Sequence, residues 1–342
     1  MSKQLVLEIC ASLLVSLLLV EGIVRIFGLA PEIAVISFGR YRLSANEKIG
    51  YEPRPRAEGA DGASYVWSYP LSQVNEFGYR DRNHEREKPP GVFRIVVIGD
   101  SIAAGYRIDA LEDVFPFQLE QALRRRGVDA EILNFGVSGY NTQQEVYTLI
   151  DRGLAYDPDL VVLAYCLNDR DRIDSGVLSI LLASKGESAV VRSRIDRWLS
   201  FSAVYRMLRH RFARRELDEE LARRDKAVEQ DGVEDSLGRL ANLSETRGFE
   251  VLVVVFPLLD NLARRKDARE RQAIAELAWR KRLHHLDLHP ALLDCVRREP
   301  QVGLDPYHPS VEGHRCAGDA IAQHLFARGF APQRWQRGAP RR

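Results

Sequence analysis

The hydrophobic pattern of the chain changes at Phe93. From there to about Arg328, short runs of β-branched residues alternate with stretches in which apolar residues recur every three or four positions. The short runs predict strands buried on both faces, and the longer periodic stretches predict helices that cover them. The expected strands are Phe93–Gly99, Ala130–Phe135, Asp159–Cys166, Glu250–Pro257 and a less regular one at His284–Leu288. The expected helices are Val114–Arg126, Thr142–Gly153, Asp218–Arg247, Arg264–Arg282 and Val311–Arg328.

Strands and helices that alternate in this way form a mainly parallel sheet with helices on both sides. Residues 93–330 are therefore expected to form a three-layer α/β/α sandwich of flavodoxin-like type. Residues 31–92 are rich in Gly, Pro, Tyr and charge and lack sustained helical periodicity, so we expect an accessory or linker region there. Residues 331–342 form a basic tail.

The first 30 residues are predicted to form a hydrophobic helix. Between Leu5 and Leu29 the charged residues are Glu8, Glu21 and Arg25, and about 20 apolar residues suffice for a helical span. No small-x-small cleavage site follows the apolar run, which favours an uncleaved membrane anchor over a cleaved signal peptide. A helix packed on the domain is the other alternative. Lys3 favours a cytoplasmic N-terminus although Arg25 opposes it, and we expect the following domain to lie outside the cytoplasm.

A basic amphipathic segment is expected within an insertion at about residues 170–215. Between Arg192 and Arg215 there are eight arginines against the single Asp196, and aromatic or aliphatic residues recur every three or four positions. Such a helix could lie on an anionic membrane surface. The interpretation we favour is a lid helix that packs on the domain and keeps its arginines in water.

Composition excludes several classes of function. The formal net charge is +1, which gives no general excess of positive charge for nucleic acid. The cysteines have neither zinc-site spacing nor the density of a disulfide scaffold, and we interpret them as small hydrophobic residues: Cys10, Cys166, Cys295 and Cys316. Histidines between His284 and His289 would alternate between the faces of a strand. We therefore expect no metal and no cofactor.

Chemically useful residues follow the predicted strands, where parallel sheets bind their ligands. Ser101 stands in Gly99-Asp-Ser-Ile-Ala-Ala-Gly105, Gly139 follows the second strand and Asn168 follows the third. Asp305 and His308 stand three residues apart just before the last helix. Each of these alone has a commoner structural explanation, as a cap, a turn glycine, a turn asparagine or a surface histidine.

Together these residues make up a set that acyl transfer requires. A serine hydroxyl becomes a good nucleophile when a histidine takes its proton and a carboxylate orients that histidine. Glycine N–H groups and an asparagine amide can stabilise the oxyanion that forms. Asp100, Asp169 and His314 lie beside these positions, and we interpret them as structural.

In this order, the four motifs resemble those of the SGNH/GDSL hydrolase family over about Phe93 to Arg328. The resemblance implies Ser101 as nucleophile, Ser101, Gly139 and Asn168 as the oxyanion hole, His308 as general base and Asp305 as its orienting carboxylate. Cys166 stands where many members have Gly, and Ile102 where Leu is usual. The stretch Asn75-Glu-Phe-Gly-Tyr-Arg80 and the N-terminal helix resemble a bacterial membrane-anchored subgroup.

The implied activity is that of a serine esterase that cleaves an acetyl or short acyl group from a saccharide, lipid or small molecule. An O-acetyltransferase acting on cell-envelope polysaccharide would use the same residues, and a non-catalytic carbohydrate-binding or scaffold domain is the third alternative. The expected location is the periplasmic side of a bacterial inner membrane. The N-terminal helix, and possibly residues 192–215, would contact that membrane.

Overall fold

A five-stranded sheet lies at the centre of the part of the chain that the structure describes. The computed structural model describes residues 3–29, 41–56, 71–170, 199, 201–205, 207–208, 219, 232–260, 262–264, 266–298 and 301–330. Within them the strand order is β4-β3-β5-β6-β7, and every neighbouring pair is parallel. The strands are β3 (Phe93–Gly99), β4 (Ala130–Asn134), β5 (Leu160–Tyr165), β6 (Glu250–Val255) and β7 (His284–Asp287). The predicted parallel sheet is confirmed.

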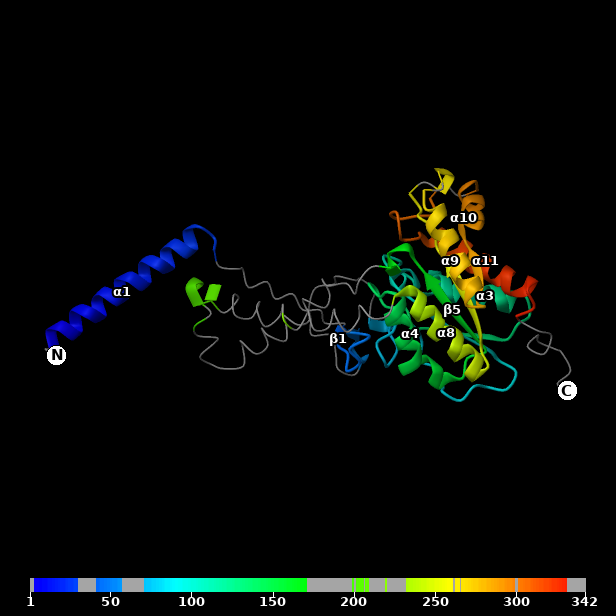
Figure 1. Ribbon diagram of the computed structural model, residues 1–342, viewed down its shortest axis with the longest axis horizontal. Helices are drawn as coiled ribbons and strands as arrows, with labels where there is room; N and C mark the ends of the chain where they lie inside the picture. Colours follow the sequence, from blue (N-terminus) through cyan, green and yellow to red (C-terminus); the bar gives the residue numbers. More distant parts are fainter. Residues whose placement is uncertain are drawn as a thin grey trace.

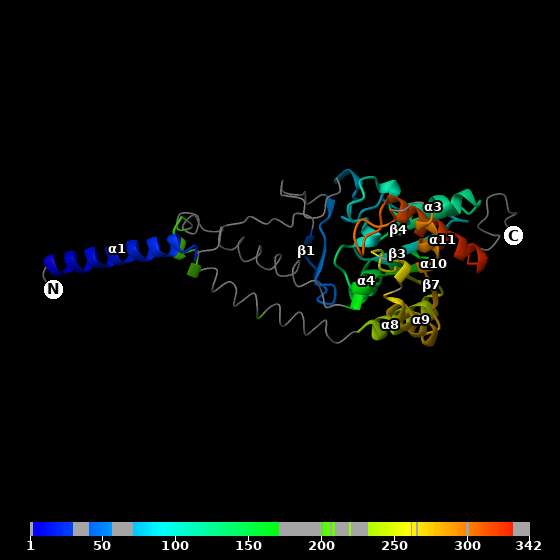
Figure 2. The same cartoon turned by 90° about the horizontal axis from the view of Figure 1, so that it is seen from above.

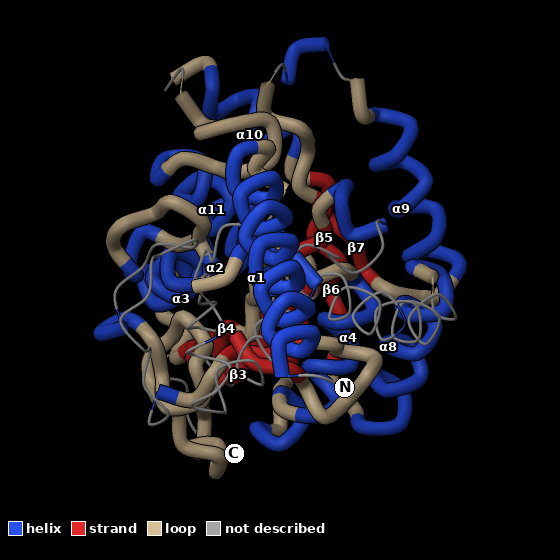
Figure 3. Tube along the Cα trace, turned by 90° about the vertical axis from the view of Figure 1, so that its left-hand side faces the viewer, coloured by secondary structure: helices blue, strands red, loops and turns tan. Residues whose placement is uncertain are grey.

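Helices cover both faces of this sheet, as Figures 1 and 3 show. One layer contains α3 (Phe115–Arg125), α10 (His289–Val296) and α11 (Val311–Ala327), and the other contains α4 (Thr142–Asp151), α8 (Val233–Arg247) and α9 (Ala268–Arg280). Alternate residues of each strand face opposite layers, so Ile95 and Val97 pack with the first layer and Val96 and Ile98 with the second. The predicted three-layer sandwich is confirmed.

Some element bounds differ from the sequence prediction. The helix expected from Arg264 begins at Ala268. The Asp267 side chain just before it accepts a hydrogen bond from the Leu258 N–H (2.9 Å), which ties the start of the helix to the segment after β6. Helix α10 was not expected, although Pro290 in its first turn is a typical start signal. Of the predicted helix from Asp218, residues 220–231 lie outside the described residues, as does most of the 192–215 segment.

Helix α1 (Lys3–Ile26) has the length and apolar composition needed to cross a membrane. It extends away from the α/β domain in Figures 1 and 2. The Glu21 carboxylate accepts hydrogen bonds from the N–H groups of Ala203 (2.7 Å) and Val204 (3.0 Å), and Arg25 donates to the Phe201 carbonyl (2.5 Å). The described part of the 192–215 segment therefore contacts the end of α1.

Residues 41–56 pack against the α/β domain. Strands β1 (Tyr41–Leu43) and β2 (Tyr51–Pro53) form an antiparallel pair. The buried Tyr51 hydroxyl donates to the Ser138 carbonyl (2.9 Å), and the Tyr140 hydroxyl donates to the Tyr51 carbonyl (2.5 Å). This hairpin thus supports the loop that contains Gly139.

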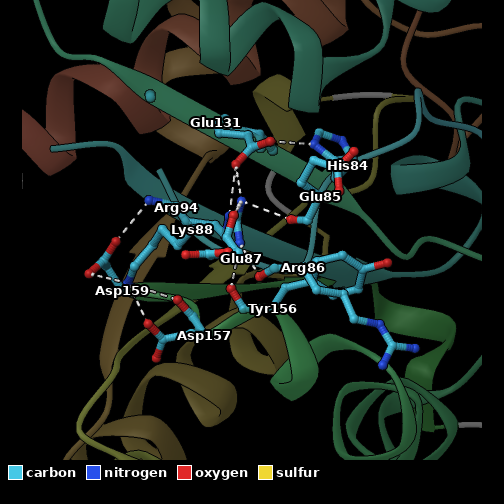
Figure 4. Close-up of polar contacts among 12 residues, drawn as sticks. His84, Glu85, Arg86, Glu87, Lys88, Arg94, Glu131, Tyr156, Asp157 and Asp159 are labelled. Carbon is cyan, nitrogen blue, oxygen red and sulfur yellow. Dashed lines mark hydrogen bonds and ion pairs between the residues drawn. The ribbon is translucent and has the colours of Figure 1, made fainter. Parts of the chain in front are cut away.

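Residues 81–94 are joined to the sheet by the buried polar cluster in Figure 4. Arg94, at the start of β3, is fully buried and donates to Glu131 Oε2 (2.7 Å) and to the Tyr156 carbonyl (2.9 Å). Glu131 also bonds the imidazole of His84 (2.7 Å), whose other nitrogen lies 3.1 Å from Asp81. The charges of Arg94, Glu131 and His84 each have a partner, as burial requires.

The stability of the protein should fall as pH rises above 6.5, because His84 is protonated in the folded state. Burial alone would lower the pKa of His84, but hydrogen bonds to Asp81 and Glu131 outweigh burial and raise it to about 9. A raised folded-state pKa contributes stability that is complete below 6.5 and lost as pH rises through 9, at most about 3 kcal/mol here. Urea unfolding at pH 6.5 and 9.5 measures this loss. His84→Gln should reduce the difference between the two pH values, and an unchanged difference would contradict the assignment.

Two cysteines are joined in a disulfide, contrary to their interpretation as small hydrophobic residues. Cys295 on α10 is bonded to Cys316 on α11, 21 residues later. Their sequence spacing gives no signal, since the pairing arises from the contact between two helices. Cys166 is buried and free, as expected. The disulfide closes a covalent loop that contains Asp305 and His308.

Candidate active site

Ser101 lies where β3 meets the short helix α2 (Ser101–Ala104), at the carboxyl end of the sheet. The Asp100 side chain caps this helix by accepting a hydrogen bond from the Ile102 N–H (2.8 Å). Gly105 ends the helix in the left-handed conformation. Ser101 is only 6% exposed, so it is largely buried on a tight turn at the carboxyl end of the sheet.

The structure brings Ser101, His308 and Asp305 together. Ser101 Oγ lies 2.9 Å from His308 Nε2. On the other side of the ring, His308 Nδ1 lies 2.9 and 2.8 Å from the two carboxylate oxygens of Asp305. The first two residues are 207 positions apart in the sequence, and the fold places them within hydrogen-bonding distance.

A compact loop fixes the acid and the base. Asp305 Oδ1 accepts hydrogen bonds from the N–H groups of Tyr307 and His308, both at 2.9 Å. The Leu304 N–H donates to the His308 carbonyl (2.8 Å). Burial alone would raise the pKa of Asp305, but these backbone donors and the imidazole hold it below its usual value. Asp305 is therefore a carboxylate at neutral pH and can accept from His308 Nδ1.

The glycine-containing loop after β4 reaches the end of β3. The Val137 N–H donates to the Gly99 carbonyl (3.0 Å), which brings residues 137–139 beside the turn that holds Ser101. Gly139 has φ of 80°, a conformation in which a side chain would be strained. Among the described residues, neither the Gly139 N–H nor the Ser101 N–H has a hydrogen-bond acceptor.

Asn168 lies in the turn after β5, beside Asp100. Its Nδ2 atom is 3.4 Å from Asp100 Oδ2, which is also 3.4 Å from Ser101 Oγ. Its Oδ1 atom is buried and has no partner among the described residues. Burial raises the pKa of Asp100, although the Ile102 N–H and the neighbouring His308 act against this. Asp100 thus connects the candidate nucleophile to the candidate amide donor.

Residues beside the site serve the local structure. Asp169 Oδ2 accepts a hydrogen bond from the Cys166 N–H (2.9 Å) and closes the turn after β5. Burial, together with Asp100 and Asp169, raises the pKa of the Cys166 thiol well above its usual value. His314 is buried, its Nδ1 lies 3.2 Å from the Phe115 N–H, and burial with the nearby Arg80 lowers its pKa to about 3. This imidazole is neutral and accepts a backbone hydrogen bond.

The histidines of the 284–289 run lie in two different elements, β7 and α10. His284 is exposed, and the buried His289 bonds the Leu262 carbonyl through Nε2 (2.8 Å). Among the described residues, the close group of potential metal ligands is Cys295, Glu312 and Cys316. The two sulfur atoms of that group are already joined to each other.

Sequence reasoning missed two residues that contact the site. The ring of Tyr106 lies against the His308 imidazole with 4.3 Å between centroids. Arg80 is fully buried and donates to carbonyls of the turn that follows Ser101. Arg80 had a sequence signal, because it ends the Asn75–Arg80 stretch noted above, but nothing in that stretch indicates a contact with residue 105.

Comparison with known proteins identifies the family. The sequence model of the GDSL-like lipase/acylhydrolase family matches residues 97–316, which includes every candidate site residue. A search of curated proteins finds no match.

Solved structures of esterases and acylhydrolases are similar at low identity. An acetyl xylan esterase is 17% identical with a TM-score of 0.41 and covers 68% of this chain and 99% of its own. A two-domain esterase active on acetylated mannans is 14% identical with a TM-score of 0.44 and covers 73% of this chain and 52% of its own. A lipase/acylhydrolase from Enterococcus faecalis is 18% identical with a TM-score of 0.42, covering 69% and 96%. The family match extends over more than half of the sequence, and the chain belongs to the GDSL-like lipase/acylhydrolase family.

Proposed function

We propose that the protein is a serine esterase that cleaves an acetyl or other short acyl group from a saccharide, lipid or small-molecule ester. The observation that carries this proposal is the contact series from Ser101 Oγ through His308 to Asp305, at 2.9 and 2.8 Å. Membership of an acylhydrolase family supports it. A non-catalytic binding domain would have no need of this arrangement.

The chemistry follows from the positions of these atoms. His308 Nε2 takes the hydroxyl proton as Ser101 Oγ bonds to the ester carbonyl carbon, and Asp305 stabilises the imidazolium. The N–H groups of Ser101 and Gly139 and the Asn168 amide stabilise the oxyanion. The imidazolium then gives its proton to the departing alcohol, which leaves an acyl-serine. Water, deprotonated by His308, attacks that acyl group, and release of the acid restores the hydroxyl.

The acyl-serine intermediate could instead pass its acyl group to a saccharide hydroxyl, which would make the protein an O-acetyltransferase. The two outcomes differ in product stoichiometry with p-nitrophenyl acetate. An esterase releases equal amounts of acetate and p-nitrophenol, with or without an added oligosaccharide. A transferase releases less free acetate than p-nitrophenol once the oligosaccharide is present. We expect equal amounts of acetate and p-nitrophenol. The Ser101→Ala variant measures the background hydrolysis that does not depend on the serine.

The acyl chain length can be tested in the same assay. The low exposure of Ser101 supports a short acyl group, so p-nitrophenyl acetate should be hydrolysed faster than the octanoate. A preference for octanoate would overturn the short-chain assignment and leave the serine mechanism unaffected.

We also propose that α1 anchors the protein in a bacterial inner membrane, with the α/β domain on the periplasmic side. The apolar α1 and the Cys295–Cys316 disulfide support this, because disulfides persist in oxidising compartments and are rare in the cytosol. The full-length chain recovered from cells and unfolded in denaturant should therefore show the Cys295 and Cys316 thiols protected from maleimide until it is reduced.

The same chain without residues 1–29, retained in the cytoplasm, is the matched control and should have both thiols free. Free Cys295 and Cys316 thiols in the membrane-bound full-length protein would contradict this orientation. Replacing both cysteines with serine should lower the free energy of unfolding by about 3 kcal/mol, as expected for a disulfide that joins residues 21 positions apart.

A further inference from the structure

Two side chains hold the turn after the Ser101 helix: Gln73 donates to the Asp109 carbonyl (2.7 Å), and Arg80 donates to carbonyls at both ends of the turn. Arg80 is fully buried, and its guanidinium donates to two pairs of adjacent backbone carbonyls. These bonds run from Nη1 to Ala104 (3.2 Å) and Gly105 (2.6 Å) and from Nη2 to Ile108 (2.6 Å) and Asp109 (3.3 Å). Arg80 therefore fixes both ends of the 104–109 turn.

The backbone of this turn requires such a clamp. Gly105 has φ of 72°, and a Cβ atom there would lie 2.5 Å from Val114 Cγ2 and 2.8 Å from Arg80 Nη1. Arg107 also has positive φ, 58°, which is uncommon for a residue with a side chain. Strained backbone of this kind persists where the surrounding structure determines it, and the hydrogen bonds from Arg80 do so here.

Tyr106 lies in the middle of the clamped turn and contacts the candidate base. Its N–H donates to the Ser101 carbonyl (2.9 Å), so the turn is also bonded to the residue that carries the nucleophile. Its ring lies 4.3 Å from the His308 ring, with 47° between the planes. The imidazole thus has Asp305 at one nitrogen, Ser101 at the other and the Tyr106 ring on its face.

We propose that Arg80 and Tyr106 are positioning residues for the acyl-transfer reaction. Arg80 holds the 104–109 turn, and the turn places the Tyr106 ring so that His308 Nε2 stays directed at Ser101 Oγ. This inference rests on the proposed function, because it assigns a role toward the same nucleophile and base. The two residues act through His308, so their loss should lower kcat and leave KM nearly unchanged.

Arg94 provides a matched control for Arg80. Both arginines are fully buried, and both donate to several backbone carbonyls. Arg94 does so at the amino end of β3, as Figure 4 shows, whereas Arg80 contacts the turn beyond its carboxyl end. If Arg80 had a purely structural role, replacing it would change kcat per folded molecule no more than replacing Arg94.

The experiment uses the full-length protein in detergent. Two kinds of measurement are made, and each is normalised to the amount of folded protein. One measurement is kcat and KM for p-nitrophenyl acetate. The other is the rate at which diethyl p-nitrophenyl phosphate modifies Ser101, which reports the nucleophile and base without a deacylation step. Arg80→Met and Tyr106→Ala should each lower kcat and the modification rate by about 10²-fold. Tyr106→Phe, which keeps the ring, should stay within about twofold of wild type.

Arg94→Met should lower the melting temperature and keep kcat, and Trp279→Ala, at an exposed aromatic residue on α9, should change neither. Activity of Tyr106→Ala within twofold of wild type would overturn the proposal, as would a Tyr106→Phe variant as slow as Tyr106→Ala. If Arg80→Met does not fold, Arg80→Ala assayed with added ethylguanidinium replaces it. We expect ethylguanidinium to restore kcat, and an activity that stays equally low with and without it would overturn the role of Arg80.

Failure of the proposed function would look different. In that case the wild-type protein itself would show neither Ser101-dependent turnover nor modification by the phosphate ester. Wild-type activity that persists in the Arg80 and Tyr106 variants would refute the positioning roles alone.

Discussion

Replacing Ser101 with alanine should lower kcat/KM for p-nitrophenyl acetate by about 10⁴-fold or more. The Ser101 hydroxyl lies 2.9 Å from His308 Nε2 and is the group from which the imidazole can take a proton. Without it no acyl-enzyme forms, and only the residual rate from the oxyanion donors and bound water remains. Steady-state kinetics on matched amounts of folded protein measure the effect.

Ser236→Ala is the matched control for this substitution. Ser236 is also a buried serine, but it lies on α8, and its hydroxyl has no partner among the described residues. Its loss should leave kcat/KM unchanged. If the Ser101→Ala variant kept more than a tenth of the wild-type kcat/KM, Ser101 would be excluded as the nucleophile.

The second large effect should come from Asp305→Asn, with a loss of about 10³- to 10⁴-fold in kcat/KM and little change in fold. Asp305 accepts from His308 Nδ1 at 2.8 Å and so keeps the proton on that nitrogen and the lone pair of Nε2 toward Ser101. An asparagine amide can donate to Nδ1 instead, which favours the tautomer with the proton on Nε2. That tautomer cannot take the serine proton.

Asp294→Asn, at an exposed position on α10 whose carboxylate pairs with Arg297 at 3.3 Å, controls for the loss of one negative charge. It should retain full activity. Because the pKa of Asp305 is held below its usual value, the orienting carboxylate should stay ionised under mildly acidic conditions. If Asp305→Asn and wild type had the same kcat/KM at every pH, Asp305 would have no role in the mechanism.

Much of the fold was predictable because it depends on local pattern. The run Phe93–Gly99 is apolar apart from Arg94, as expected for a strand covered on both faces, and the structure buries all seven residues. The same logic predicts that the chemical residues lie at one edge of the sheet. Parallel strands end on the same side of a sheet, so Ser101, Gly139 and Asn168 had to approach one another.

What the sequence pattern did not predict depends on contacts between distant segments. The Cys295–Cys316 bond requires α10 and α11 to pack side by side, and α10 itself was not expected. The role of Arg80 depends on four backbone carbonyls of a turn that lies more than twenty residues later. A backbone carbonyl has no sequence signature, so no motif could have indicated this contact.

The separation of Ser101 from His308 has a consequence for the synthesis of the protein. The nucleophile and the sheet edge around it are translated in the first half of the chain, whereas the base is 207 residues later and its loop is followed by α11, which packs against α3 in the finished domain. A nascent or truncated polypeptide that ends before residue 308 would present an inert serine. The proposed ester cleavage would therefore require a polypeptide that extends through His308 and lets this residue reach Ser101.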